Sequence, residues 1–434
     1  PCVNLPQVAH GNPAAVASPF SAILRRLFPY LHNQVITMRD PLFRMALILG
    51  LLSAVGPFAI DMYLPALPEV AAQLGTTEAR AAQTLTSYFI VFGIAQMIYG
   101  PMADAVGRKR PLVIGVVIFL IATIAAARAP TIGWLIAARG LQGLGAATLM
   151  VVPRAVIRDV SSGPGAARMM AAVMIVISIS PMLAPLTGSF VMNWGGWREI
   201  FAVLAAAAVI SLCLIVFVLP ETLPQERRQP VRIGPMVAGA KRLLTDRRFM
   251  GLTMIGGFGM ASFFVFLSTA SFVYTKQYGL SPKGFSLAFA ANAIGFFSAS
   301  QFAGRLAERF GMERVISIAI TGFAASMAVV TLLVWLGLDQ LPVVMLGLFI
   351  GNAFLGLVMP TAMVMSLDPH PDIAGLASSL GGTFQMLTGG AMIALVGPFM
   401  DNTSATMVPA IALCALLAWV AAAASLPRLR LRLV

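Results

Sequence analysis

Charged residues are scarce in this chain. Of its 434 residues, 10% are Asp, Glu, Lys or Arg, whereas 59% are hydrophobic. Soluble domains carry about 25% charged residues. The polar surface of this chain is too small to cover a water-soluble globule. The composition therefore excludes a soluble domain and predicts an all-α protein that crosses a membrane many times.

Cysteine and histidine are scarce as well, with three of each. The cysteines have no paired spacing, which argues against a disulfide framework and a zinc site. The histidines lie outside the apolar segments, and no nucleophile–base set of an enzyme lies within them. We therefore expect no metal, no cofactor and no enzymatic activity. These residues are Cys2, Cys213 and Cys414, and His10, His32 and His370.

Long apolar runs are abundant. A membrane-spanning helix needs about 20 mostly apolar residues, and the sequence contains twelve candidates, each with ends defined to within a few residues. The first six cover about residues 44–67, 81–103, 111–128, 131–156, 168–193 and 198–219. The second six cover about residues 249–274, 284–304, 315–337, 341–366, 373–398 and 405–426.

The basic residues predict the orientation. If both termini are cytoplasmic, most of the 29 Lys and Arg residues fall in cytoplasmic segments, as the positive-inside rule requires. The net charge of +13 is then explained by topology, and we expect no nucleic-acid partner. The basic residues left outside are Arg80, Arg128, Arg198, Lys276 and Lys283.

A weak internal repeat predicts two halves. Gly100, Asp104, Gly107 and Arg110 follow the second span, and Gly304, Glu308, Gly311 and Arg314 follow the eighth at the same spacing. We expect a disordered extension at 1–40, a six-helix bundle at 41–219, a cytoplasmic linker at 220–248 and a second six-helix bundle at 249–434. Residues 1–37 lack an initiating Met and a signal-peptide pattern, so an upstream misread of the start is an alternative.

Two charges stand out within the apolar runs. Arg139 lies inside the fourth span, where a charge costs roughly 2.5–3.5 kcal/mol on insertion scales. Asp61 lies in the first span at a similar predicted depth. Opposite charges in a many-helix membrane protein favour a site that handles protons. A purely structural ion pair, or an Asp61 that faces an aqueous vestibule, remains an alternative.

Several motifs resemble those of one transporter family. Gly100-x3-Asp104-x2-Gly107-Arg108-Lys109-Arg110 resembles the loop 2–3 signature of the major facilitator superfamily. Arg139-Gly-Leu-Gln142-Gly143, with Asp159 at the helix end, resembles its proton-coupling motif. Ile60-Asp61-Met-Tyr63-Leu-Pro65 and Pro220-Glu221-Thr222-Leu223 resemble the bicyclomycin and chloramphenicol resistance (Bcr/CflA-type) drug:proton antiporters. On the fifth span the family's Gly-Pro pair is replaced by Ala184-Pro185, with Gly188 further on.

The resemblance implies a major facilitator fold of twelve transmembrane helices in two six-helix halves. It implies proton coupling by Asp61 and Arg139. It also implies a conformational latch that locks the outward-facing state, and a helix-packing role for the antiporter motif. The latch would comprise Gly100, Asp104, Gly107, Arg108, Lys109, Arg110 and Asp159, and the packing motif Pro181, Pro185 and Gly188.

The expected function is proton-coupled efflux of small amphipathic drugs by alternating access, in the bacterial cytoplasmic (inner) membrane. A proton-linked exporter of an endogenous metabolite such as an amino acid, or an uncoupled facilitator, is the alternative. We expect a monomer in the lipid bilayer that binds a small molecule and protons and is driven by the proton gradient. Candidate substrate-binding residues are Tyr63, Tyr88, Gln142 and Asn292, and the 27 Phe and 25 Met could line an adaptable cavity.

Overall fold

The computed structural model describes residues 41–161, 163–228, 230 and 233–426. The predicted N-terminal extension at 1–40 lies outside the described residues. From Ala46 onward the described residues form one compact unit. Every regular element described is helical, as predicted for an all-α protein.

The helices of the first half follow the predicted spans. α2 (Pro41–Asp61) is followed by η1 (Leu64–Ala66) and α3 (Leu67–Gln73), so the first span extends to Gln73 rather than to residue 67. Pro65 and Pro68 stand at this break, where proline removes backbone donors that a continuous helix needs. The remaining helices are α4 (Glu78–Val106), α5 (Lys109–Ala127), α6 (Ile132–Val160), α7 (Gly163–Gly195) and α8 (Trp197–Cys213), which ends in the π-helical turn η2 (Leu214–Val218).

The second half begins after the linker. The short 3₁₀ helix η3 (Gln225–Arg227) and the amphipathic helix α9 (Ile233–Thr245) lie within the predicted linker range of 220–248. The six long helices that follow are α10 (Arg247–Lys276), α11 (Pro282–Phe310), α12 (Met312–Trp335), α13 (Leu341–Leu367), α14 (Ala374–Val396) and α15 (Ser404–Ser425), with η4 (Pro371–Ile373) before α14 and η5 (Gly397–Phe399) after it. The exact division into domains stays a prediction.

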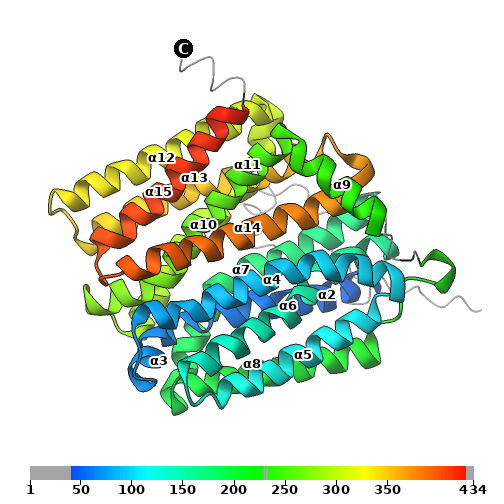
Figure 1. The fold of residues 1–434 in the computed structure, drawn as a ribbon, viewed down its shortest axis with the longest axis horizontal. Helices are drawn as coiled ribbons and strands as arrows, with labels where there is room; N and C mark the ends of the chain where they lie inside the picture. Colours follow the sequence, from blue (N-terminus) through cyan, green and yellow to red (C-terminus); the bar gives the residue numbers. More distant parts are fainter. Residues whose placement is uncertain (1–40, 162, 229, 231–232, 427–434) are drawn as a thin grey trace, which may run out of the picture. The chain divides into compact units, whose positions relative to one another are not determined.

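Each half packs mainly on itself. Figure 1 shows α4, α5, α6 and α8 side by side in the first half, where α6 contacts α4 and α5, and α5 contacts α8. In the second half α10 contacts α14 and α15, and α13 contacts α11 and α12. Among the described residues, α4 with α14 and α7 with α11 make the most extensive contacts between the halves, and α10 also contacts α3 and α4. Thr383 on α14 donates a hydrogen bond to the backbone oxygen of Gly93 on α4 across this boundary, at 2.8 Å.

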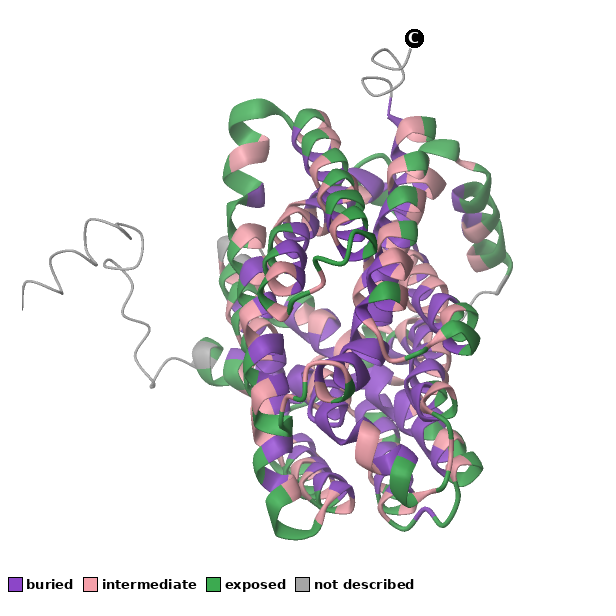
Figure 2. Cartoon of the chain, turned by 90° about the vertical axis from the view of Figure 1, so that its left-hand side faces the viewer, coloured by how far each residue is buried: buried purple, intermediate pink, exposed green. Residues whose placement is uncertain are grey.

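The outer faces of the helices are apolar. Figure 2 shows buried residues between the helices and exposed residues around them. Large hydrophobic side chains are among the exposed ones, including Phe217 at 81% and Trp335 at 69% exposure. Of the helices that the structure describes, eleven are long and apolar enough to span a membrane. α11 is 29 residues long, but Asn292, Gln301 and several serines make it less apolar; with it, the predicted twelve are present.

Candidate functional site

A cavity of about 400 Å³ lies between the two halves. α2, α4, α6 and α7 contribute its walls from the first half, and α10, α11, α13 and α14 from the second. This volume is within the range of small-molecule sites, which typically measure about 300–1,000 Å³. The two halves therefore enclose a space large enough for a small organic molecule.

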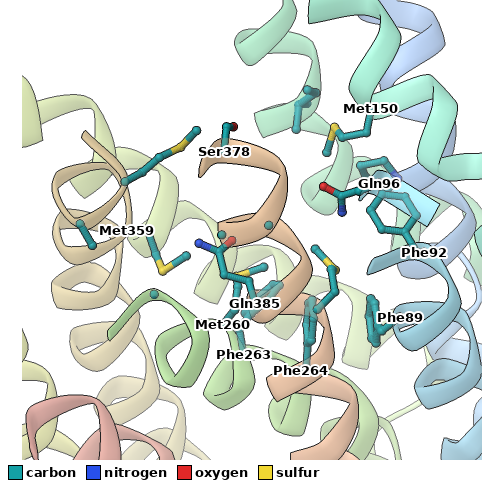
Figure 3. Close-up of a pocket in the computed structure, with 18 of the residues that line it drawn as sticks. Phe89, Phe92, Gln96, Met150, Met260, Phe263, Phe264, Met359, Ser378 and Gln385 are labelled. Atoms are coloured by element: carbon teal, nitrogen blue, oxygen red, sulfur yellow. The ribbon is translucent and has the colours of Figure 1, made fainter. Parts of the chain in front are cut away.

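Aromatic rings and thioethers dominate the cavity wall, as the composition suggested. Methionine side chains are flexible and polarisable, so such a wall can repack around ligands of different shape. Figure 3 shows rings and sulfur atoms from several helices around the same space. The lining includes Phe89, Phe92, Phe263, Phe264, Phe296 and Phe297, and Met150, Met174, Met260, Met359, Met363 and Met386.

Two amides supply polarity to this wall. Gln96 on α4 and Gln385 on α14 both line the cavity (Figure 3). Gln96 packs against Gly382 of the second half: a Cβ added to Gly382 would lie 2.8 Å from the Oε1 atom of Gln96. Neither amide is among the four substrate-binding residues predicted from the sequence. Their only signal in the sequence is an amide within an apolar run, and amides in such runs more often join helices than bind ligand.

The halves close on each other at one end of the cavity. Lys276, the last residue of α10, forms an ion pair with Glu78, the first residue of α4. Ser286 on α11 donates to the backbone oxygen of Pro185 on α7 at 2.8 Å. Deeper in, the rings of Phe89 and Phe264 stack across the boundary with centroids 3.8 Å apart. We call this the closed end.

The cavity extends toward the opposite end of the helices. Its lining includes Arg154 in the last turns of α6 and Thr253 near the start of α10. Ser366, near the end of α13, and Ser378, near the start of α14, line it at the same level. The loop between α4 and α5 lies at this end as well, so we call it the loop 2–3 end.

Asp61 lies at the deep end of this cavity. It is the last residue of α2, is only 4% exposed, and contributes to the lining. No hydrogen bond or ion pair joins it to Arg139 in the described part of the chain. The structure therefore contains no direct Asp61–Arg139 ion pair. Asp61 instead contributes to the wall of the cavity between the halves.

Arg139 lies behind the cavity wall and is fully buried. Its Nη1 atom donates to the backbone oxygen of Ala59 at 3.0 Å and to the side chain of Gln142. Its guanidinium lies 4.9 Å from the ring centre of Tyr63 and 4.7 Å from that of Tyr88. Such cation–π contacts replace part of the lost hydration. Its Nε and Nη2 atoms have no partner among the described residues.

The backbone of α2 connects Arg139 with Asp61. Ala59 accepts the Arg139 hydrogen bond two residues before Asp61, so the two charges share the predicted depth. The hydroxyl of Tyr88 donates to the backbone oxygen of Gly56 on the same helix at 3.2 Å. A displacement of the end of α2 would therefore change the surroundings of both charges. Proton coupling by this pair stays a prediction.

The four candidate substrate-binding residues lie elsewhere. Tyr63, Tyr88 and Gln142 surround Arg139, and Gln142 donates to Thr123 at 2.8 Å. Asn292 is buried in α11 and donates to the backbone oxygen of Ala288. None of the four is among the residues that line the cavity. The described geometry thus gives their substrate role no support.

The loop 2–3 residues form a cluster of ion pairs. Arg108 binds Asp104 at 2.6 Å and Asp159, at the end of α6, at 2.7 Å. Burial lowers the pKa of Arg108, but the two carboxylates outweigh burial and raise it above its ordinary value. Lys109 donates through its Nζ atom to the backbone oxygen of Val216. Gly100 faces α14, with Ser379 3.9 Å from a Cβ added there.

Glu221 joins this cluster from the linker. Its carboxylate accepts the backbone N–H groups of Arg108 at 2.9 Å, Lys109 at 3.2 Å and Leu223 at 3.0 Å. Gly107 permits the approach: its φ is +96°, and an added Cβ would lie 2.5 Å from the Glu221 carboxylate. In the sequence, Glu221 is part of a motif that resembles the family, and nothing there predicts its contact with Arg108. A contact across more than a hundred residues has no local signal.

The antiporter motif packs α7 closely. A Cβ added to Gly188 would lie 2.0 Å from the backbone oxygen of Met62, so only glycine fits beside the residue that follows Asp61. Pro185 accepts the Ser286 hydrogen bond at the closed end, and Pro181 lines the cavity. The geometry is consistent with the helix-packing role, which stays a prediction.

A helical bundle with apolar outer faces and a cavity between two halves defines the class, a multi-pass membrane transporter. The family model of the Major Facilitator Superfamily matches residues 49–394, and the chain belongs to this superfamily. It is not an enzyme. The relatives described below are bacterial, which agrees with an inner-membrane protein that carries small molecules.

Three relatives indicate the branch. The chain is 34% identical to an uncharacterized MFS-type transporter of Bacillus subtilis, over 85% of this chain and 91% of that protein. It is 28% identical to a bicyclomycin resistance protein homolog of Haemophilus influenzae, over 86% and 93%. It is 31% identical to a chloramphenicol resistance protein of Pseudomonas aeruginosa, over 62% and 64%. These relatives confirm the Bcr/CflA-type resemblance.

A solved structure supports the fold. The D-xylose–proton symporter superposes with a TM-score of 0.67 over 87% of this chain and 96% of its own, at 19% sequence identity. At that identity the similarity establishes the fold alone. The major facilitator fold predicted from the sequence is confirmed.

Glu221 provides a test of the ion-pair cluster. Partial burial would raise the pKa of its carboxyl, but three backbone donors and Arg228 outweigh burial and lower the pKa below the ordinary 4.5. We expect Glu221→Gln to lower the Tm at pH 7 by about 1–3 °C, since the group is partly exposed. A depressed folded-state pKa adds stability above the ordinary value. The difference from wild type should therefore disappear as the pH falls below 4.5.

Thermal unfolding of purified protein from pH 7 to below pH 4.5 measures this difference. Glu226→Gln is the matched control, because Glu226 is an exposed acid of the same linker. A Tm difference for Glu221→Gln that stayed constant with pH would contradict the assignment.

Proposed function

We propose that this protein exports small amphipathic drugs across the cytoplasmic membrane in exchange for protons. The observation that carries the proposal is the position of Asp61, a buried carboxyl group in a cavity of aromatic and Met side chains. The relatives named for bicyclomycin and chloramphenicol resistance support a drug rather than an endogenous metabolite as substrate. Both termini would be cytoplasmic, and the protein would be a monomer. Its transport would be driven by the proton gradient and would need no cofactor.

The coupling would follow from competition between protonation of Asp61 and occupancy of the cavity by substrate. A proton on Asp61 neutralises the carboxyl, and an amphipathic substrate occupies the cavity beside it. Because Arg139 holds the α2 backbone at Ala59, substrate that displaces α2 also alters the field at Asp61. Each proton that moves inward across 100 mV supplies about 2.3 kcal/mol for export.

Replacement of Asp61 tests the coupling. We expect Asp61→Asn to lower gradient-driven efflux at least tenfold, because Asn cannot exchange a proton. Everted vesicles with an imposed pH gradient, screened first with chloramphenicol and bicyclomycin, measure this. Asp368→Asn is the control, since Asp368 is exposed and lies outside the cavity. Undiminished efflux by Asp61→Asn would remove this residue from the mechanism. Wild-type efflux that survives collapse of the gradient would indicate an uncoupled facilitator.

The closed end supports alternating access. Export requires that this end opens, which would break the Glu78–Lys276 ion pair and separate Phe89 from Phe264. We therefore expect a cross-link across the closed end to stop transport.

The test uses the Glu78→Cys/Lys276→Cys double variant with its native cysteines replaced by alanine. A bifunctional phenylene dimaleimide should reduce efflux to background, while the monofunctional N-phenylmaleimide should not. A cross-linked transporter that exports at the uncross-linked rate would refute alternating access through this end.

The loop 2–3 cluster is proposed as a latch. All its ion pairs in the described residues lie within the first half and the linker, and toward α14 its residue Gly100 approaches Ser379. The cavity extends toward this same end, so the described state is the one in which a latch between the halves would be released.

We expect Asp104→Ala to favour this state further. The measurement is the labelling rate of the cavity position in a Ser378→Cys variant by an impermeant maleimide added at the loop 2–3 end. The rate should rise several-fold when Asp104→Ala is added and stay the same when Glu226→Ala is added. Equal rates with and without Asp104 would show that the cluster does not act as a latch.

A further inference from the structure

Of the described residues that line the cavity, two are charged, and the proposed mechanism uses one of them. Asp61 is the first; the second is Arg154 on α6. In the topology predicted from the sequence, Arg154 is a basic residue of the cytoplasmic side. It lies fifteen residues after Arg139, which is about 22 Å further along the helix at ~1.5 Å per residue. Arg154 thus lies at the loop 2–3 end, far from Asp61.

Arg154 has no acidic partner among the described residues. Arg158, one turn further along α6, carries a charge of the same sign and cannot compensate it. The nearest acid in the sequence, Asp159, is bound by Arg108 and by the Thr222 hydroxyl. The cluster that neutralises Arg108 therefore leaves Arg154 uncompensated.

The other arginines around the cavity differ in this respect. Arg108 has two carboxylates, and Arg139 has the Ala59 oxygen, Gln142 and aromatic faces. A half-buried guanidinium in a wall of apolar side chains costs free energy unless an anion or water compensates it. At Arg154 the protein supplies no such anion in the described state.

A second unpartnered group lies at the same end. Thr253, near the start of α10, is 4% exposed and lines the cavity, and its hydroxyl has no hydrogen-bond partner among the described residues. A hydroxyl can donate one hydrogen bond to an oxygen atom. Together, Arg154 and Thr253 provide unsatisfied donors from both halves at one end of one cavity.

We propose that Arg154, assisted by Thr253, is an oxyanion-binding site of this cavity. The favoured ligands would be amphipathic organic anions or zwitterions, with an aromatic body and a carboxylate or a similar oxyanion. A guanidinium presents two parallel N–H groups that match the two oxygens of a carboxylate. The Phe and Met side chains deeper in the cavity would hold the apolar body. This inference rests on the proposed function, since it assigns a substrate class to the same cavity.

A matched pair of fluorescent probes tests the inference. 1-Pyrenebutyrate and 1-pyrenebutanol share the ring and the chain length and differ in the carboxylate. Their Kd values for the purified full-length protein in detergent at pH 7 are measured by energy transfer from tryptophan, and protein-free micelles give the background. The readout is the ratio of the two Kd values, which cancels general effects on the cavity.

We expect wild type to bind the carboxylate more tightly than the alcohol. Arg154→Gln should shift the Kd ratio about tenfold against the carboxylate, Arg154→Lys should restore part of the preference, and Thr253→Val should shift the ratio about two- to threefold. Arg158→Gln should leave the ratio unchanged, because that residue is exposed and outside the lining. Size-exclusion profiles and the Arg154→Lys variant show whether the folded state persists.

Three results would overturn the inference: no carboxylate preference in wild type, an unchanged ratio in Arg154→Gln, or an equal shift in Arg158→Gln. The outcome is separable from that of the proposed function. Gradient-driven export of chloramphenicol without an Arg154-dependent ratio would leave the exporter standing and the oxyanion site refuted. A Kd ratio that depends on Arg154, without export of any drug, would support the oxyanion site and refute the exporter.

Discussion

The burial of one guanidinium organises the first half of this protein. An arginine at the centre of a membrane-spanning helix is expensive unless the protein replaces its hydration. Around Arg139 this is done by the backbone of α2, by Gln142, and by the rings of Tyr63, Tyr88 and Phe201 from three further segments. The charge thereby fixes where α2, α4, α6 and α8 meet, and it fixes the end of α2 that carries Asp61.

In this arrangement Asp61 and Arg139, which the sequence predicted to form one proton-handling site, form no direct ion pair with each other. Arg139 is surrounded by structure, whereas Asp61 faces the cavity, and the helix between Ala59 and Asp61 connects them. A direct ion pair would have held both charges in one state. In the proposed exchange with protons, a connection through the backbone would let the carboxyl lose or gain a proton while the guanidinium keeps its partners.

Patterns within one segment were predictable from the sequence. The apolar runs predicted the helices, and the four-residue spacing of Asp104 and Arg108 is that of an ion pair one helical turn apart. The Arg108–Asp159 pair joins two helices, and only the family resemblance placed Asp159 in the same cluster. Contacts between distant segments were not predictable. Glu221 reaches Arg108 across the whole first half, and Gln96 meets Gly382 across the two halves. Nothing near these residues in the chain indicates the partner, because the partner is brought close only by tertiary packing.

The three arginines differ in how many hydrogen-bond and ion-pair partners the protein gives them. This difference distinguishes the arginine that holds helices together from those placed near the cavity. Arg108 is neutralised by two carboxylates and holds α4, α6 and the linker together. Arg139 is satisfied in part, with Nε and Nη2 left over, next to the group that would titrate. Arg154 has no acidic partner among the described residues and faces the cavity. A buried hydrogen-bond donor without a partner lowers the stability of a membrane protein. Arg154 is the least satisfied of these three arginines, and in the oxyanion-site proposal its partner is a ligand from outside the chain.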